Sequence, residues 1–336
     1  MDASIRPRSY SGTLLLTRND VAQLLSLDEC IEAVEDAFRM QHDSKTTIAG
    51  LSVSGGGFHI KAATLELDRP YFAAKVNANF PSNRMREGLP TIQGMIALCD
   101  AENGYPLALI DSIEITMLRT GAASAVAAKH LARSNSRIAT IVGCGTQGRV
   151  QLRALARVCK PELVHIFDID TARAEEIAAE IQPELGIEIQ VIRGLLEDAI
   201  RASDICVTCT PSKQTLVRKE WVKPGTFLAA VGADSEDKHE IDPQLMASSK
   251  VVVDVLDQCA AIGDLHHAIT QGFMTRSDVH GELADVVASR ITGRESQDET
   301  IVFDSTGTAL EDVAAAVRVY RKAVIAHRGL LVDLAN

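Results

Sequence analysis

The sequence predicts an α/β protein that combines a doubly wound, mostly parallel sheet domain with a smaller, split α+β domain. Three observations lead to this prediction. Short apolar runs alternate with helical patterns from residue 138 to residue 254, and a glycine-rich turn follows the first run. Residues 46–109 instead form short alternating segments separated by turns. A length of 336 residues also exceeds one typical core and favours two domains.

The N-terminal elements follow from capping and turn signals. A T-x-x-D motif at residues 17–20 predicts a first helix, and an S-x-x-E motif at residues 26–29 predicts a second that ends near Met40. Strands and turns fill residues 46–109, with Asn103-Gly104 as a hairpin turn. Residues 115–133 are helical and rich in small side chains, so we expect this helix to be buried between the domains.

The second half of the chain alternates strands and helices. The tail beyond residue 304 carries apolar residues at helical spacing, which fits a chain crossing back to its first domain. Strands are predicted at 138–142, 163–167, 187–191, 205–210, 226–231 and 250–254, with helices after the glycine-rich turn and at 171–182 and 195–202.

Composition and charge bound the classes of function. The chain is 46% hydrophobic and 24% charged, with a formal net charge of −11. This balance gives no basic field for nucleic acid or an anionic membrane. No apolar run reaches the roughly 20 residues of a membrane span, and the N-terminus lacks the apolar core of a signal peptide. We therefore expect no nucleic-acid partner, no membrane partner and a cytoplasmic location.

The cysteines and histidines do not predict a metal site. Seven cysteines without a repeated spacing argue against a disulfide framework. Cys206 and Cys209 form a C-x-x-C, but in a strand residues three apart point to opposite faces. The histidines show no H-E-x-x-H spacing.

The glycine-rich turn is the strongest motif. It reads G-C-G-T-Q-G at residues 143–148, between a predicted strand and a predicted helix, as in Rossmann-type dinucleotide sites. Asp168 ends the next strand, where a carboxylate can bind the adenosine ribose and favours NAD over NADP. Arg173 keeps NADP possible, because an arginine there can accommodate a 2′-phosphate. The predicted cofactor contacts are Gly143, Gly145, Thr146, Gln147, Gly148 and Asp168, with Thr210 and Gly232 at further strand ends.

Three charged residues are candidates for chemistry. Lys75 lies on a predicted apolar strand, where its stem could cover apolar surface or its ammonium could bind a substrate carboxylate. Arg119 lies among small residues, either as a surface residue or as a bidentate carboxylate ligand. Asp234 follows a strand, either as part of a turn or as an acid/base near the cofactor, where Lys238 and Glu240 could tune it.

Several motifs in one order resemble the ornithine cyclodeaminase/mu-crystallin family over most of the chain. They are F-A-A-K-V-N at residues 72–77, G-L-P-T at 88–91, L-R-T-G-A at 118–122, the glycine-rich turn, G-A-D at 232–234 and F-D-S-T-G at 303–307.

The resemblance implies both a fold and a set of roles. Residues 1–120 with 305–336 would form a substrate-binding and dimerisation domain, and 121–304 an NAD-binding Rossmann domain. Lys75 and Arg119 would hold the substrate carboxylate, Asp234 would be the acid/base, and Gly307 would contact the cofactor. A further family arginine has no clear counterpart, and Lys61 is the nearest cation in that region. A homodimer is expected.

The implied chemistry is hydride transfer at the α-carbon of a small amino or imino acid. The preferred hypothesis is ornithine cyclodeamination to proline and ammonia. The alternatives are reduction of a cyclic ketimine such as pyrroline-2-carboxylate, alanine dehydrogenation, or a non-catalytic ligand-binding protein like the crystallin member.

Overall fold

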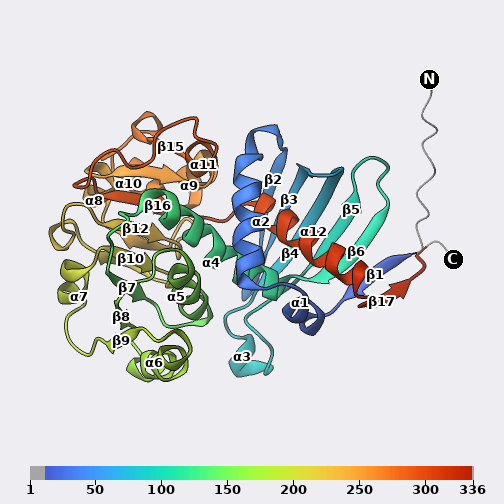
Figure 1. Ribbon diagram of the computed structural model, residues 1–336, viewed down its shortest axis with the longest axis horizontal. Helices are drawn as coiled ribbons and strands as arrows, with labels where there is room; N and C mark the ends of the chain where they lie inside the picture. Colours follow the sequence, from blue (N-terminus) through green and yellow to red (C-terminus); the bar gives the residue numbers. More distant parts are fainter. Residues whose placement is uncertain (1–11, 335–336) are drawn as a thin grey trace.

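The computed structural model describes residues 12–334, arranged as two halves that are each built on one sheet (Figure 1). Residues 1–11 and 335–336 lie outside the described residues, so the N-terminus examined for a signal peptide is not covered. The sheets, helices and their order confirm the predicted fold class. No helix in the described part of the chain is both long enough and apolar enough to span a membrane.

The larger sheet is parallel throughout, with eight strands among residues 12–334 in the order β15-β14-β16-β12-β10-β7-β8-β9. Its strands are β7 (Ile138–Val142), β8 (Leu163–Phe167), β9 (Glu188–Val191), β10 (Ile205–Thr208), β12 (Phe227–Ala230), β14 (Lys250–Val253), β15 (Gly281–Glu282) and β16 (Ile301–Asp304). Its helices are α5 (Thr146–Val158), α6 (Thr171–Leu185), α7 (Leu196–Ala202), α8 (Pro243–Ala247), α9 (Leu256–Ile262), α10 (Asp264–Thr270) and α11 (Leu283–Val287).

The order of these strands reverses beside β7. The chain runs outward from β7 through β8 and β9, then returns to place β10 on the other side of β7. Ligands of doubly wound sheets bind at such a switch point, beyond the carboxyl ends of the strands. Gly143 follows β7 and Thr210 follows β10, so both lie at this point.

The smaller sheet has seven strands among the described residues, in the order β17-β1-β6-β5-β4-β3-β2. Neighbouring strands are antiparallel except β1 and β6, which are parallel. These strands are β1 (Thr13–Leu16), β2 (Thr46–Val53), β3 (Gly56–Glu66), β4 (Pro70–Asn79), β5 (Ile92–Asp100), β6 (Pro106–Asp111) and β17 (Leu330–Val332).

Helices from both ends of the chain cover one face of the smaller sheet. α1 (Arg18–Leu24) and α12 (Ala309–Ile325) contact its strands, and α2 (Leu27–Arg39) packs mainly on α12 and α4 (Ser112–Leu131), the helix that joins the two halves. Figure 1 shows α12 in red beside α2 in blue, and α12 contacts β3, β4 and β5. The chain beyond residue 304 therefore crosses back to the smaller sheet, as the sequence predicts.

The long helix α4 (Ser112–Leu131) joins the two halves. It begins three residues before the predicted start because Asp111 caps it, accepting a hydrogen bond from the Ile113 N–H. Its small residues are buried as predicted, and Gly121 faces α5, where a Cβ would lie 2.7 Å from Val150 Cγ1. The predicted domain boundary at 120/121 falls inside this continuous helix.

Local signals explain the other connections. The capping boxes at 17–20 and 26–29 both form, which confirms those helix starts. Gly104 adopts a φ of 78° in the turn between β5 and β6. The two-stranded sheet of β11 (Lys213–Val217) and β13 (His239–Ile241) is not predicted. The short helices α3 (Asn83–Arg86), η1 (Gln41–Asp43), η2 (Lys219–Trp221) and η3 (Arg276–Asp278) complete the structure of the described residues.

Candidate active site

The glycine-rich turn is packed tightly at two glycines and open at the third. Gly143 has a φ of 104°, and a Cβ there would lie 2.9 Å from Thr210 Cγ2. A Cβ on Gly148 would lie 2.1 Å from the Gly143 carbonyl oxygen. Gly145 has nothing within 4 Å of its Cβ position, and it starts α5 without a side-chain cap. Unpaired N–H groups at the start of α5 therefore face free space, as an anion-binding turn requires.

Asp168 ties this turn to the end of β8. One carboxylate oxygen accepts a 2.7 Å hydrogen bond from the Cys144 N–H, and the other accepts a 2.9 Å bond from the Asp170 N–H. Each oxygen keeps further capacity to accept, and the side chain is partly exposed. Arg173 pairs with Asp170 at 3.3 Å, beside this carboxylate. The donors and acceptors at this edge fit the pyrophosphate and ribose of a dinucleotide.

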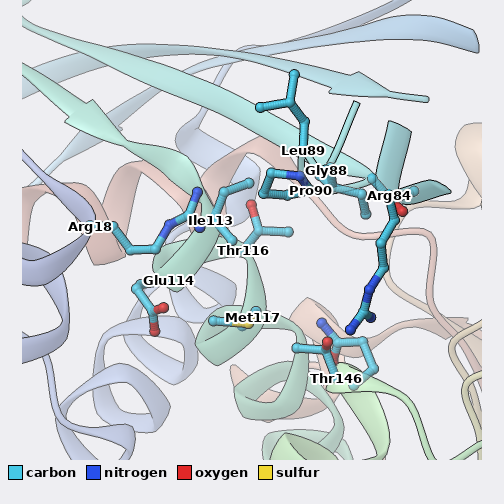
Figure 2. A pocket seen from close by; sticks show the side chains of 13 residues that line it. Arg18, Arg84, Gly88, Leu89, Pro90, Ile113, Glu114, Thr116, Met117 and Thr146 are labelled. Carbon is cyan, nitrogen blue, oxygen red and sulfur yellow. The ribbon is translucent and has the colours of Figure 1, made fainter. Parts of the chain in front are cut away.

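A cavity of about 520 Å³ lies between this turn and the smaller sheet (Figure 2). The start of α4, the loop 88–92 and the start of α5 line it. Figure 2 shows Arg84 of α3 directed toward Thr146 at the start of α5. Gln147 also lines the cavity, and its buried Oε1 has no hydrogen-bond partner. The cavity therefore presents the cation of Arg84 next to the open turn.

A cluster of buried charged side chains lies under the smaller sheet. Lys75 is only 3% exposed, and its Nζ lies 2.5 Å from Asp312 Oδ2. Arg119 is also buried, with Nη1 2.9 Å from Glu311 Oε2 and Nε 3.3 Å from Asp312 Oδ1. The interpretations of Lys75 as a water-exposed ammonium and of Arg119 as a surface residue are therefore wrong. Both side chains are held by carboxylates in the first turn of α12.

Lys61 brings a third cation into this cluster. It lies opposite Lys75 in the antiparallel pair of β3 and β4. Its ammonium donates to two backbone carbonyls, Thr306 at 3.0 Å and Gly307 at 2.6 Å. Lys75 and Arg119 thus contact the two carboxylates Glu311 and Asp312, whereas Lys61 contacts backbone carbonyls and forms no salt bridge among the described residues. Buried charge without a partner is costly, so the cluster favours an added anion.

Burial shifts the pKa values of these groups in different directions. Burial lowers the pKa of Lys75 to about 7, although Asp312 acts to raise it. Burial also lowers the pKa of Lys61, with the charge of Arg119 acting in the same direction. For Arg119 burial opposes the charged form, but Asp312 and Glu311 outweigh this effect and raise its pKa. Arg119 is therefore the permanent cation of the cluster, and Lys75 is the titratable one.

The two halves of the protein meet at a small cavity of about 100 Å³ beside this cluster. Lys75, Arg119 and Lys61 line it from one half, and Asp234 lines it from the other. The Asp234 side chain is 52% exposed and forms an ion pair with Lys238. His59 also lines the cavity, and burial lowers its pKa against the raising effect of Asp234.

The structure thus gathers the predicted residues at two neighbouring places. The turn 143–148, Asp168, Thr210 and Gly232 lie at the switch point of the larger sheet. Gly307 lies elsewhere, in the charge cluster, where a Cβ would be 2.3 Å from Arg119 Nη1. Glu240 binds Thr210 and Gly232 rather than Asp234, so of the two residues expected to tune Asp234 only Lys238 pairs with it.

Sequence reasoning missed the carboxylates of α12. Glu311 belongs to a capping box with Thr308, a signal that is readable as T-x-x-E before the last helical pattern. That signal predicts where the helix starts in the sequence, but it does not predict that the helix lies under the smaller sheet. Asp312 has no local signal, because its partners are Lys75 and Arg119, far away in the sequence.

Comparison with known proteins places these features in a family. Residues 11–326 match the ornithine cyclodeaminase/mu-crystallin family. An alanine dehydrogenase of Archaeoglobus fulgidus is 38% identical over 315 residues, 93% of this chain and 95% of that protein.

Two solved structures have the same fold along nearly the whole chain. An archaeal alanine dehydrogenase dimer with bound NAD superposes with a TM-score of 0.91 at 37% identity, covering 96% of this chain and 99% of that chain. The Δ1-pyrroline-2-carboxylate reductase of Thermococcus litoralis, in complex with NADH and L-proline, gives 0.90 at 36% identity, covering 95% and 100%. The protein described here belongs to the ornithine cyclodeaminase/mu-crystallin family.

Proposed function

We propose that the protein catalyses NAD(P)-dependent hydride transfer at the α-carbon of a small amino or imino acid. The observation that carries the proposal is that three buried cations, Lys61, Lys75 and Arg119, line one cavity, and that Lys61 has only backbone carbonyls as partners. A substrate carboxylate would supply the missing anion. Arg119 offers a planar fork for such a group, and Lys75 offers a second positive charge.

The cofactor would lie along the edge that carries the glycine-rich turn. The open Gly145 position and the Asp168 carboxylate support NAD, with NADP as an alternative because Arg173 is near. Solved relatives contain NAD or NADH. When bound, the nicotinamide supplies or accepts the hydride at the α-carbon.

The residues of this chain would divide the remaining work. Lys75 and Arg119 hold the carboxylate and so orient the α-carbon, which could lower the barrier by several kcal/mol, up to about 7–11 in ideal cases. Asp234 exchanges the proton of the amino or imino nitrogen, directly or through a water. Lys238, paired with Asp234, would hold its carboxylate in place.

The size of the cavity favours a net redox reaction on an alanine-sized or proline-sized substrate. At about 100 Å³ this cavity is much smaller than the cavity of about 520 Å³ beside the glycine-rich turn, which favours a small substrate. Among the described residues that line it, Asp234 is the only carboxylate that could form an ion pair with a second amine. Alanine dehydrogenation and pyrroline-2-carboxylate reduction both fit these limits.

Ornithine cyclodeamination is the second candidate, and one observation favours it. A cavity of about 640 Å³ adjoins the cavity of about 100 Å³. It is lined by Asp234, Asp237 and Asp257. A cationic side-chain amine could extend into this acidic space. A relative named ornithine cyclodeaminase, from Agrobacterium tumefaciens, is 33% identical over 77% of this chain.

One panel of substrates separates these candidates. Alanine, pyrroline-2-carboxylate, proline and ornithine are each offered with NAD or NADH, and both NADH absorbance and released ammonia are followed. Net redox chemistry changes the absorbance, whereas cyclodeamination releases ammonia and forms proline without accumulating NADH. Binding of NADH without turnover of any substrate would favour a non-catalytic, crystallin-like role and refute the proposal.

We also infer two domains and a homodimer. The smaller sheet with α1, α2 and α12 would be the substrate domain, and the larger sheet the cofactor domain. The uncovered face of the smaller sheet exposes Leu51, Val53, Phe58, Val76 and Met95, an apolar set that supports contact with a second copy. Light scattering should give twice the chain mass, and Phe58→Glu should shift it toward the monomer.

A further inference from the structure

Glu240 is a fully buried carboxylate that no step above uses. It lies on β13, and its exposed fraction is 0%. Its Oε1 accepts two hydrogen bonds from Thr210, one from the backbone N–H and one from the hydroxyl, both at 2.7 Å. Its Oε2 accepts a 2.8 Å hydrogen bond from the Gly232 N–H. One side chain thus joins the segments that follow β10 and β12.

The fit around this carboxylate is tight. A Cβ on Gly232 would lie 2.5 Å from Glu240 Oε2 and 2.3 Å from the Thr210 carbonyl oxygen. The backbone of Glu240 is held in turn, because Asp264 Oδ1 accepts from the N–H groups of Glu240 and Ile241, both at 2.8 Å. The carboxylate therefore holds together the segments that follow the two strands, beyond their last backbone hydrogen bond, which the Val231 N–H donates to the Thr208 carbonyl.

The surroundings of Glu240 contain no compensating cation. Among the described residues it forms no salt bridge, and the charged group that acts on it most strongly is the carboxylate of Asp264. Cys206 of β10 and Cys209, just beyond it, are the nearby thiols, and the charge of Glu240 adds to the effect of burial in raising the pKa of both. Three donated hydrogen bonds are what stabilises the ionised form.

We propose that ionised Glu240 is a positioning residue, which sets the wall of the cofactor site at Thr210 and Gly232, so that its protonation weakens dinucleotide binding. This inference rests on the proposed function, because it assumes that the cofactor lies along these strand ends. A protonated carboxyl turns one acceptor into a donor, which would face an N–H or O–H that also donates. The strand ends would then lose a shared acceptor and separate.

Glu240 is protonated in a pH range that experiments can reach. Burial, with the charge of Asp264 adding to it, raises the pKa of Glu240 to about 7. The ionised form therefore dominates above that pH and is lost as the pH falls through it. We expect NADH to bind tightly at pH 8.5 and progressively more weakly below pH 7, by up to about tenfold per pH unit.

The test measures the Kd of NADH by fluorescence between pH 6 and 8.5, without any substrate. In Glu240→Gln the amide offers one acceptor and one donor group where three donors converge, so binding should be at least roughly tenfold weaker at pH 8.5 and independent of pH. Glu220→Gln changes an exposed glutamate of the same half and should keep the wild-type profile. A wild-type profile in Glu240→Gln, or no pH dependence in the wild type, would overturn the inference.

A second variant keeps the test decisive if Glu240→Gln fails to fold. Thr210→Val removes one of the three donors to the ionised carboxylate and should move the midpoint of the NADH profile to higher pH. Thr210→Ser keeps the hydroxyl and should restore the wild-type midpoint. A midpoint that stays fixed in Thr210→Val contradicts the inference. Failure of the wild type to bind NADH at any pH would instead reject the proposed function.

Discussion

Raising the pH should weaken the binding of a carboxylate ligand through Lys75. Burial lowers the pKa of this lysine to about 7, so in the free protein its ammonium is increasingly lost above that pH. A bound carboxylate favours the charged form and must restore the proton before it gains the contact. The affinity for the carboxylate ligand is therefore highest below pH 7. It falls as the pH rises above 7, by up to about tenfold per pH unit.

The ligand for this measurement should carry a carboxylate but no ionisable amine. Tetrahydrofuran-2-carboxylate has the shape of proline with a ring oxygen in place of the nitrogen, so its own charge is constant from pH 6 to 9. Its inhibition constant, or its Kd from calorimetry with NADH present, should rise up to about a hundredfold between pH 7 and pH 9. The permanent charge of Arg119 sets the affinity that remains.

Variants identify the lysine responsible. Lys75→Met should bind the ligand about 10 to 100 times more weakly at pH 6, the loss expected for a hydrogen bond to a charged group, and should show little further change up to pH 9. Lys45→Met removes an exposed lysine of the same half and should match the wild type. Equal pH profiles in the wild type and Lys75→Met would refute the assignment of Lys75 to the carboxylate.

Three further changes test the remaining parts of the site. Asp234→Asn should abolish turnover while NADH binding persists; retained turnover would remove Asp234 from the acid/base role. Arg84→Met should weaken ADP about 10-fold or more but leave adenosine unchanged, whereas Arg86→Met, on the same short helix but outside the cavity, should affect neither. Gly145→Ala should reduce NADH affinity at nearly unchanged Tm because its Cβ meets no protein atom, whereas Gly148→Ala, which meets the Gly143 carbonyl, should lower stability by about 1–3 kcal/mol in chemical denaturation.

The features that the sequence predicts best are those encoded by neighbouring residues. The strands 138–142 and 163–167 appear with the predicted bounds, and the helix after the glycine-rich turn begins inside the motif. Short-range rules of capping, glycine geometry and apolar periodicity are sufficient there. The pair β11 and β13 was missed because each strand is short and joins a partner about 25 residues away, with no alternating pattern of its own.

The same distinction between local and distant contacts separates the site residues that the sequence predicts from those that it leaves open. The glycine-rich turn is local, so the sequence predicts its position between a strand and a helix, whereas the strand order that makes this place a switch point is seen only in the structure. For Lys75 and Arg119 the sequence left a surface role and a ligand role open, because burial depends on a partner. That partner, Asp312, lies on α12. Its Oδ2 comes within 2.5 Å of Lys75 Nζ only because the chain returns to the smaller sheet.

Helix α4 explains how two separately encoded sites act at one place. Arg119 lies on this helix in the charge cluster, and Gly121, two residues later, packs against Val150 and Ala154 of α5. The glycine-rich turn runs into the start of α5, so this helix contact sets the distance between Arg119 and the edge proposed for the cofactor. A side chain at position 121 would push these helices apart, since its Cβ would lie 2.7 Å from Val150 Cγ1. Under the proposed function, the small residues of α4 would serve the chemistry indirectly, because hydride transfer tolerates little error in the spacing of its two reactants.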